Sequence, residues 1–376
     1  MKNNSGQCWV SVLIFFALQF PLMGYCDSGS GWIKSLFESK GKNMKEVAVK
    51  VAELHEDEDI NIWGLDFSPD GKYLAATSPN TVSMSSNRVE VQIWDWQSGK
   101  IVRTLEKAGG NDGHTTESIR YSPDGRLLVA CHSRAQGYVV ARIWNTETWA
   151  IVHDITDPVG GGQGCSAIGF TPDGKSLIRI TDRIYNKPGD NLFIYDTATW
   201  QPMWGLRTVP FQPEVLTISP DGNFIALGGS IISSKPQVVI LDMTQRAIVR
   251  TIENFDVERL AWSPDGIHIA AVGAEYTGAG AIRSWAKIFE AQTGKQVNDE
   301  TLESGRMFIR YTPDGKYLIE GGMDGLHARL GIRIWDGQHK ELLQEMKANV
   351  GSLAVSRDGH YLAVGSRGKI FVWKLN

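Results

Sequence analysis

The tetrapeptide Ser68-Pro69-Asp70-Gly71 returns six more times along the chain in the form Ser/Thr-Xaa-Asp-Gly, where Xaa is Pro except for Arg357 in the last copy. Pro holds φ near −65° and Gly tolerates a positive φ, so each copy predicts a tight turn between two strands. The repeated aspartates are Asp70, Asp124, Asp173, Asp221, Asp265, Asp314 and Asp358. They are 54, 49, 48, 44, 49 and 44 residues apart. A period in the forties predicts a β-propeller with one blade per repeat.

Apolar residues flank every turn. A large apolar residue precedes each copy, as Phe67 does, and Leu or Ile follows each Asp by four residues, as Leu74 does. Such near-continuous apolar runs predict strands that are buried on both faces between neighbouring blades. A third strand pattern follows, ending for example in Trp94-Asp95, and a polar turn then leads to a fourth strand such as 100–106.

The two ends of the repeat region complement each other. The last repeat stops at Asn376 without a fourth strand, and residues 47–54 have the pattern of that missing strand. We therefore predict an all-β fold over 47–376, a seven-bladed β-propeller closed by the N-terminal strand pairing with the last blade. Closure removes the exposed strand edges that promote aggregation.

The seven in-phase repeats and pairs such as Trp94-Asp95 resemble the bacterial WD-repeat family of the seven-bladed type. The resemblance covers roughly residues 47–376 and implies a platform that binds a protein or peptide. Blades of that family often contain a buried His-Ser/Thr-Trp-Asp hydrogen-bond set. Only His55 and His114 lie near the histidine position here, so we expect apolar packing between blades to hold the fold together.

The N-terminal residues 1–26 have the pattern of a signal peptide. An apolar stretch over 9–25 is too short for a comfortable membrane span, and small residues permit cleavage before Asp27. Lipid attachment at Cys26 and an uncleaved anchor are the alternatives, and membrane association is expected only in those two cases. All three place the propeller outside the cytoplasm, and residues 27–46 are interpreted as a linker.

Composition and motifs favour a binding protein over an enzyme. The formal net charge is −4, without the clustered basic face that nucleic-acid binding requires. G-x-S-x-G, H-E-x-x-H and C-x-x-C motifs are absent, and the eight histidines are scattered. We predict no catalytic residue, cofactor or metal ligand. Two alternatives stay open, because propeller sites draw residues from several blades: a hydrolase or lactonase with a central-channel site, and a propeller subunit of a redox complex.

Two further stretches invite a ligand interpretation. The acidic run 56–59 could hold a divalent cation, but adjacent carboxylates diverge, and a solvated loop is the better interpretation. The glycine-rich stretch 160–164 lacks the Lys-Ser/Thr of a phosphate-binding loop, and we interpret it as an inter-blade loop.

The connections between second and third strands are long and polar. They are 78–88, 132–137, 182–191, 230–236, 275–283 and 323–330, and all should leave the face opposite the repeated turns. Long loops gathered on one face of a rigid ring are where function usually lies, although drift in unconstrained loops is the alternative. The candidate partner-binding residues are Arg88, Tyr185, Asn186, Lys187, Tyr276 and Arg283.

Two cysteines and two charged residues occupy positions in strands that we expect to be buried. Cys131 and Cys165 should lie at similar heights in adjacent blades, so a disulfide is possible, although we favour two buried free thiols. Arg179 and Glu320 stand where the other blades have Ala, Leu or Val. A buried charge needs a partner or an opening to water. Between local pairing and lining of the central cavity, we favour local pairing, because blades 3 and 6 are not neighbours.

Overall fold

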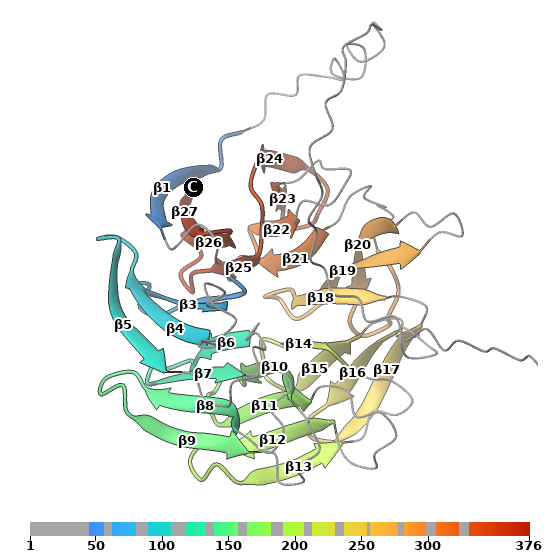
Figure 1. Ribbon diagram of the computed structural model, residues 1–376. Helices are drawn as coiled ribbons and strands as arrows, with labels where there is room; N and C mark the ends of the chain where they lie inside the picture. The colour runs from blue at the N-terminus through green and yellow to red at the C-terminus, as the bar shows by residue number, and fades with distance from the viewer. Residues whose placement is uncertain are drawn as a thin grey trace, which may run out of the picture. The chain divides into compact units, whose positions relative to one another are not determined.

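The computed structural model describes residues 45–55, 62–79, 89–106, 118–131, 139–156, 164–181, 191–206, 213–229, 237–253, 256–276, 282–297, 306–322 and 331–376. The chain divides into two units, Met1–Asn43 and Met44–Asn376, and every described residue belongs to the second. That unit consists of seven antiparallel sheets, and its described residues form no helix (Figure 1). The signal peptide and most of the linker lie outside the described residues.

The strands repeat in blade order. The innermost strands are β2 (Gly64–Phe67), β6 (Ser118–Tyr121), β10 (Cys165–Phe170), β14 (Val215–Ile218), β18 (Val257–Trp262), β21 (Arg306–Tyr311) and β25 (Ser352–Val355). The second strands are β3 (Tyr73–Pro79), β7 (Leu127–Cys131), β11 (Ser176–Thr181), β15 (Phe224–Gly228), β19 (His268–Tyr276), β22 (Tyr317–Gly322) and β26 (Tyr361–Ser366). The third strands are β4 (Val89–Asp95), β8 (Val139–Asn145), β12 (Leu192–Asp196), β16 (Gln237–Asp242), β20 (Ile282–Glu290), β23 (Ile332–Asp336) and β27 (Lys369–Leu375). The outer strands are β5 (Lys100–Glu106), β9 (Ile151–Thr156), β13 (Pro202–Leu206), β17 (Ala247–Glu253) and β24 (Leu342–Met346), with β1 (Ala48–His55) completing blade 7.

Contacts between innermost strands join the blades into a ring. Each of these strands contacts the innermost strand of the next blade, and β25 contacts β2 in turn. This arrangement confirms the predicted seven-bladed propeller. Blade 5 departs from the four-strand pattern, because a single bridge between Phe289 and Gln296 stands in place of a fourth strand in its described part.

Strand β1 closes the ring as predicted. It pairs antiparallel with β27 from Ala48 opposite Leu375 to His55 opposite Lys369. The side chain of Gln344 on β24 fastens the start of β1 to blade 6, since its Oε1 accepts hydrogen bonds of 2.7 Å from the main-chain N–H groups of Val47 and Ala48. The sheet of blade 7 therefore combines a strand from the start of the repeat region with three strands from its end.

The repeated turns share one hydrogen-bond pattern. In blade 1 the Ser68 hydroxyl donates to Asp70 Oδ1 over 2.6 Å and accepts from the main-chain N–H of Tyr73 over 2.9 Å. The other six turns repeat both bonds. The glycine of every turn has φ between 71° and 75°, a region in which a side chain would be strained. The Ser/Thr, Asp and Gly positions are thus fixed by turn geometry.

Apolar clusters fill all seven junctions between blades, as the sequence predicted. The cluster between blades 3 and 4, for example, contains Ile178 and Ile180 on one side and Ile225 and Leu227 on the other. The remaining junctions have comparable clusters. The indole Nε1 of Trp94 is buried and has no hydrogen-bond partner among the described residues, so blade 1 builds no polar network on its Trp-Asp pair.

The turn aspartates predict loss of stability in acid. The hydrogen bond from the Thr171 hydroxyl lowers the pKa of Asp173, although burial opposes it. In the other six turns burial raises the pKa, and the hydrogen bonds outweigh it, so each pKa is still below its ordinary value. Groups with lowered folded pKa values stabilise the fold above the unfolded pKa, and that stability is lost as pH falls through the folded values. We expect the turns to contribute a constant amount above about pH 5 and the Tm to fall steeply below about pH 4.

Circular dichroism melts between neutral and acidic pH measure this dependence. The matched control is Asp358→Asn, which removes one of the seven titrating turn carboxylates. It should make the decrease in Tm at acidic pH smaller by the contribution of that carboxylate. A Tm that stays constant through the acid range would show that the turn aspartates do not stabilise the fold.

Candidate interaction face

The face opposite the repeated turns carries the connections between second and third strands, because neighbouring strands in each sheet run in opposite directions. We call it the loop face. Most of the predicted site residues there, Arg88, Tyr185, Asn186 and Lys187, lie outside the described residues. The main chain of the other two is described: Tyr276 pairs with Ile282, and Arg283 pairs with Glu275, at the end of the β19–β20 hairpin. The structure therefore brings two of the six candidates together on blade 5.

The β19–β20 hairpin extends beyond its counterparts. Its register runs through nine residue pairs, from His268–Glu290 to Tyr276–Ile282. Within the described residues, second and third strands form five pairs in blades 2, 3, 4 and 6, six in blade 7 and seven in blade 1. The extra pairs lie at the loop-face end, since the turn-face end begins at the usual distance from Asp265. Blade 5 thus carries an ordered two-stranded extension on this face.

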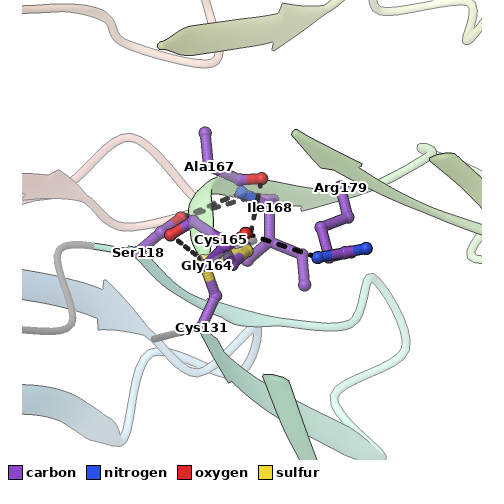
Figure 2. Close-up of a disulfide and its surroundings, with 7 residues drawn as sticks. All are labelled: Ser118, Cys131, Gly164, Cys165, Ala167, Ile168 and Arg179. Carbon is purple, nitrogen blue, oxygen red and sulfur yellow. Dashed lines mark hydrogen bonds between the residues drawn. A yellow bond between two sulfur atoms is a disulfide. The ribbon is translucent and has the colours of Figure 1, made fainter. Parts of the chain in front are cut away.

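A disulfide joins Cys131, the last residue of β7, to Cys165, the first residue of β10 (Figure 2). The two Cα atoms are 5.5 Å apart, and both residues are buried between blades 2 and 3. The expectation of two free thiols was therefore wrong. Sequence reasoning placed the cysteines at similar heights but could not orient their Cβ atoms. The disulfide lies at the bases of the connections 132–138 and 157–163.

Polar contacts surround the disulfide. The Ser118 hydroxyl on β6 lies 3.2 Å from the main-chain nitrogen of Ile168 on β10, from which it accepts a hydrogen bond, so a second link crosses the same junction (Figure 2). The guanidinium of Arg179 donates to the carbonyl oxygen of Gly164 over 3.4 Å and lies 4.9 Å from the centroid of the Phe193 ring. These contacts confirm that Arg179 is paired locally in blade 3. Its buried Nε has no hydrogen-bond partner among the described residues.

Glu320 on β22 is also paired locally, in blade 6. One carboxylate oxygen lies 3.0 Å from His339 Nε2, and the other accepts a 3.1 Å hydrogen bond from Trp335 Nε1. The side chains of Glu320 and His339 are 0% and 1% exposed. His339 has a φ of 57° in the turn before β24, so its backbone adopts a conformation that favours glycine. Sequence reasoning identified Glu320 but missed His339, which stands in an otherwise polar turn.

The structure does not test the two remaining ligand-binding candidates from the sequence. The acidic run 56–59 and residues 160–163 lie outside the described residues. Within the ranges that the structure describes, no three His, Cys, Asp or Glu residues gather in a way that could hold a metal ion. The same ranges contain no helix with the length and apolar character needed to cross a membrane.

Comparison with known proteins finds WD40 repeats in two segments of the chain. The WD domain, G-beta repeat family (WD40) matches residues 49–84 and 340–374, the two segments that meet where the ring closes. The WD repeat-containing protein 26 homolog of Arabidopsis thaliana is 25% identical to this chain over 150 residues. The match covers 40% of this chain and 23% of the Arabidopsis protein, so it spans less than a quarter of that relative. The chain carries WD40 repeats in a seven-bladed propeller, an architecture typical of protein-interaction scaffolds.

Reduction of the disulfide should destabilise the propeller. Cys131 and Cys165 are 34 residues apart, and the loss of a cross-link over a loop of that length corresponds to about 3–4 kcal/mol of chain entropy. We expect a lower Tm in the presence of reductant, and a Cys131→Ala/Cys165→Ala variant whose Tm does not respond to reductant. Thiol titration of the denatured, unreduced protein checks the bond itself. Two reactive thiols at positions 131 and 165 would contradict the disulfide.

Removal of the buried Glu320 carboxylate should lower the free energy of unfolding more than removal of a more exposed carboxylate. Glu320→Ala leaves Trp335 Nε1 and His339 without their buried acceptor, and we expect a loss of about 3–5 kcal/mol in the free energy of unfolding. Glu320→Gln keeps one acceptor oxygen and should lose less. Glu345→Ala, which removes the more exposed partner of Arg333, is the control and should lose at most about 1 kcal/mol. Equal losses for Glu320→Ala and Glu345→Ala, measured by denaturant titration, would contradict this role.

Proposed function

We propose that the protein is a non-catalytic interaction scaffold that acts outside the cytoplasm and binds a protein or peptide partner through the loop face. WD40 propellers commonly bind proteins, which supports the class of partner. The observation that carries the choice of face is the β19–β20 hairpin, which has nine residue pairs, against five to seven in the described parts of the other six blades. Paired strands present side chains with less loss of conformational entropy on binding than an irregular loop does.

The base of the loop face supports the same proposal. The disulfide ties the chain just before the connection 132–138 to the chain just after the connection 157–163, and the Ser118–Ile168 hydrogen bonds cross the same junction between blades 2 and 3. Binding residues on loops that a rigid scaffold positions are a common design in folds of this kind.

Export is the second part of the proposal. It is supported by the signal-like pattern of residues 1–26 and by the disulfide, since disulfides persist in oxidising compartments. Mass spectrometry of the protein from its native host tests it. A mature chain that starts at Asp27, or one that carries lipid on Cys26, supports export, and an intact N-terminus on protein recovered from the cytoplasm contradicts it.

Substitutions on the loop face should abolish partner binding, whereas substitutions on the turn face should not. The test compares wild-type protein, the double variant Tyr276→Ala/Arg283→Glu, and the turn-face control Lys175→Glu, whose side chain is 82% exposed. Each is cross-linked in envelope extract from the native host, and the captured proteins are quantified by mass spectrometry. We expect wild type and control to capture the same partner, and the double variant to lose it by more than about tenfold, because Tyr and Arg dominate binding energy at many interfaces.

Two results would contradict the proposal. One is equal capture by the double variant, and the other is loss of the partner in Lys175→Glu alone, which would move the interface to the turn face. Circular dichroism melts of all three proteins show whether a loss reflects unfolding.

A further inference from the structure

The innermost strands turn one hydrogen-bonding edge toward the axis of the ring, and side chains from the preceding blade cover parts of that edge. The main-chain N–H of Tyr121 on β6 donates to Asp66 Oδ2 of blade 1 over 2.8 Å. The N–H of Trp262 donates to Thr217 Oγ1 of blade 4 over 3.3 Å. Main-chain groups two residues apart on a strand point the same way. The carbonyl of Ile119 therefore faces the inner edge together with the N–H of Tyr121.

Charged residues occupy one level of this inner edge. Asp66, Arg120 and Arg310 each precede the turn aspartate of their blade by four residues, and each pairs with the residue five after that aspartate. The equivalent positions in the other four blades carry small side chains or none. They are Gly169, Thr217, Ala261 and Ala354. An aspartate and two arginines therefore lie at the same height in a ring of small residues, near the turn face.

Hydrogen bonds hold the arginine heads at the inner edge. Arg120 donates from Nη1 to the carbonyl of Ile119 over 2.6 Å, and Arg310 does the same to Ile309 over 3.0 Å. Arg259 precedes Ala261, the equivalent position of blade 5, by two residues on β18. It donates to the carbonyl of Glu258 over 2.7 Å and lies 5.2 Å from the centroid of the Phe308 ring. In all three cases the guanidinium folds back onto the residue before it, on the same inner edge.

The arginines influence one another across the ring. Burial, together with the charges of Arg120 and Arg259, lowers the pKa of Arg310 to about 9, although the attraction of Asp66 opposes the shift. Arg120 belongs to blade 2 and Arg310 to blade 6, which are not neighbours. Their repulsion therefore acts across the axis rather than through a shared blade interface. Like charges in such an arrangement are costly without a counter-ion.

Arg357 adds a further charge at the turn face. It takes the place that proline has in the other six turns, and its Nη1 donates to the carbonyl of Pro123 in the turn of blade 2. In five of the seven turns the glycine lies against the proline of the preceding turn, and a Cβ added to Gly125 would lie 3.3 Å from Pro69 Cδ. A Cβ added to Gly71, the first turn after Arg357 around the ring, would meet nothing within 4 Å, as is also the case for Gly266. Arg357 thus reaches past blade 1, and its charge also acts on Asp66.

We propose that Arg120, Arg259 and Arg310, with Arg357 at the turn face, form a binding site on the propeller axis for a free multivalent oxyanion such as phosphate. The charges of Arg120, Arg310 and Arg357 all act on the carboxylate of Asp66, which leaves about two positive charges in excess around it. Around Glu258, the carboxylates of Asp256 and Glu214 offset the charge of Arg259. Among the described residues, Arg120 and Arg310 each donate to one acceptor, although a guanidinium has five N–H donors. That planar fork matches the oxygen spacing of phosphate and carboxylate.

The test is calorimetric titration of inorganic phosphate into the full chain at constant ionic strength. We expect saturable binding of one phosphate per chain, in the millimolar range or tighter. Arg310→Met and Arg120→Met should each weaken it by about 10- to 100-fold, the loss typical of a hydrogen bond between charged groups. The control is Arg126→Met, whose exposed side chain lies on the turn of blade 2 and which should bind phosphate as wild type does.

Thermal melts give a second, independent measurement. Without phosphate, Arg310→Met should melt at the same temperature as wild type or higher, because it removes a buried charge that two other arginines repel. If Arg310 served only to cap the carbonyl of Ile309, the variant would melt lower and bind phosphate unchanged. That result, or wild-type protein that shows no saturable phosphate binding, would overturn the proposal. A general salting effect of phosphate would not saturate and would persist in every variant.

Discussion

Apolar packing between neighbouring blades is the constraint on which the rest of this structure depends. Each sheet buries both faces, and only the two adjacent blades can cover them. The ring must therefore close, and closure brings a strand from near residue 50 into the sheet of the last repeat. The apolar clusters tolerate few polar side chains. Where such a side chain occurs, as at Arg179 and Glu320, it is held by local hydrogen bonds or an aromatic ring.

Closure also explains why the inner edges need capping. The innermost strand of each blade pairs on one side only, so its other side carries main-chain groups without a strand partner. Asp66, Ser118 and Thr217 supply hydrogen bonds to the next blade at such positions. The same edge accepts the guanidinium groups of Arg120 and Arg310. Polar side chains at these positions thus stabilise the junctions and give the axis its charge.

The fold could be predicted from the sequence because its determinants are local. A hydroxyl, a carboxylate and a glycine within four residues specify each turn, and the spacing of the turns specifies the blades. Contacts between blades could not be predicted in the same way. The bond between Cys131 and Cys165 depends on how their two Cβ atoms face each other. The pairing of Glu320 with His339 depends on a turn whose histidine side chain is buried. The site residues on the loop face were chosen from composition alone, and only the main chain of Tyr276 and Arg283 is described.

The two faces of the ring differ in how freely their residues can vary. On the turn face, hydrogen bonds fix the hydroxyl and carboxylate positions of every repeat, and a positive φ fixes the glycine. Charged side chains occupy the proline position of the last turn, Arg357, and the inner-strand positions of Asp66, Arg120 and Arg310. The oxyanion site proposed above combines these positions, so the ligand proposed for the turn face is small and charged. On the loop face, the connections between second and third strands differ in length and composition from blade to blade. Such variation is why we propose that a macromolecular partner is recognised there.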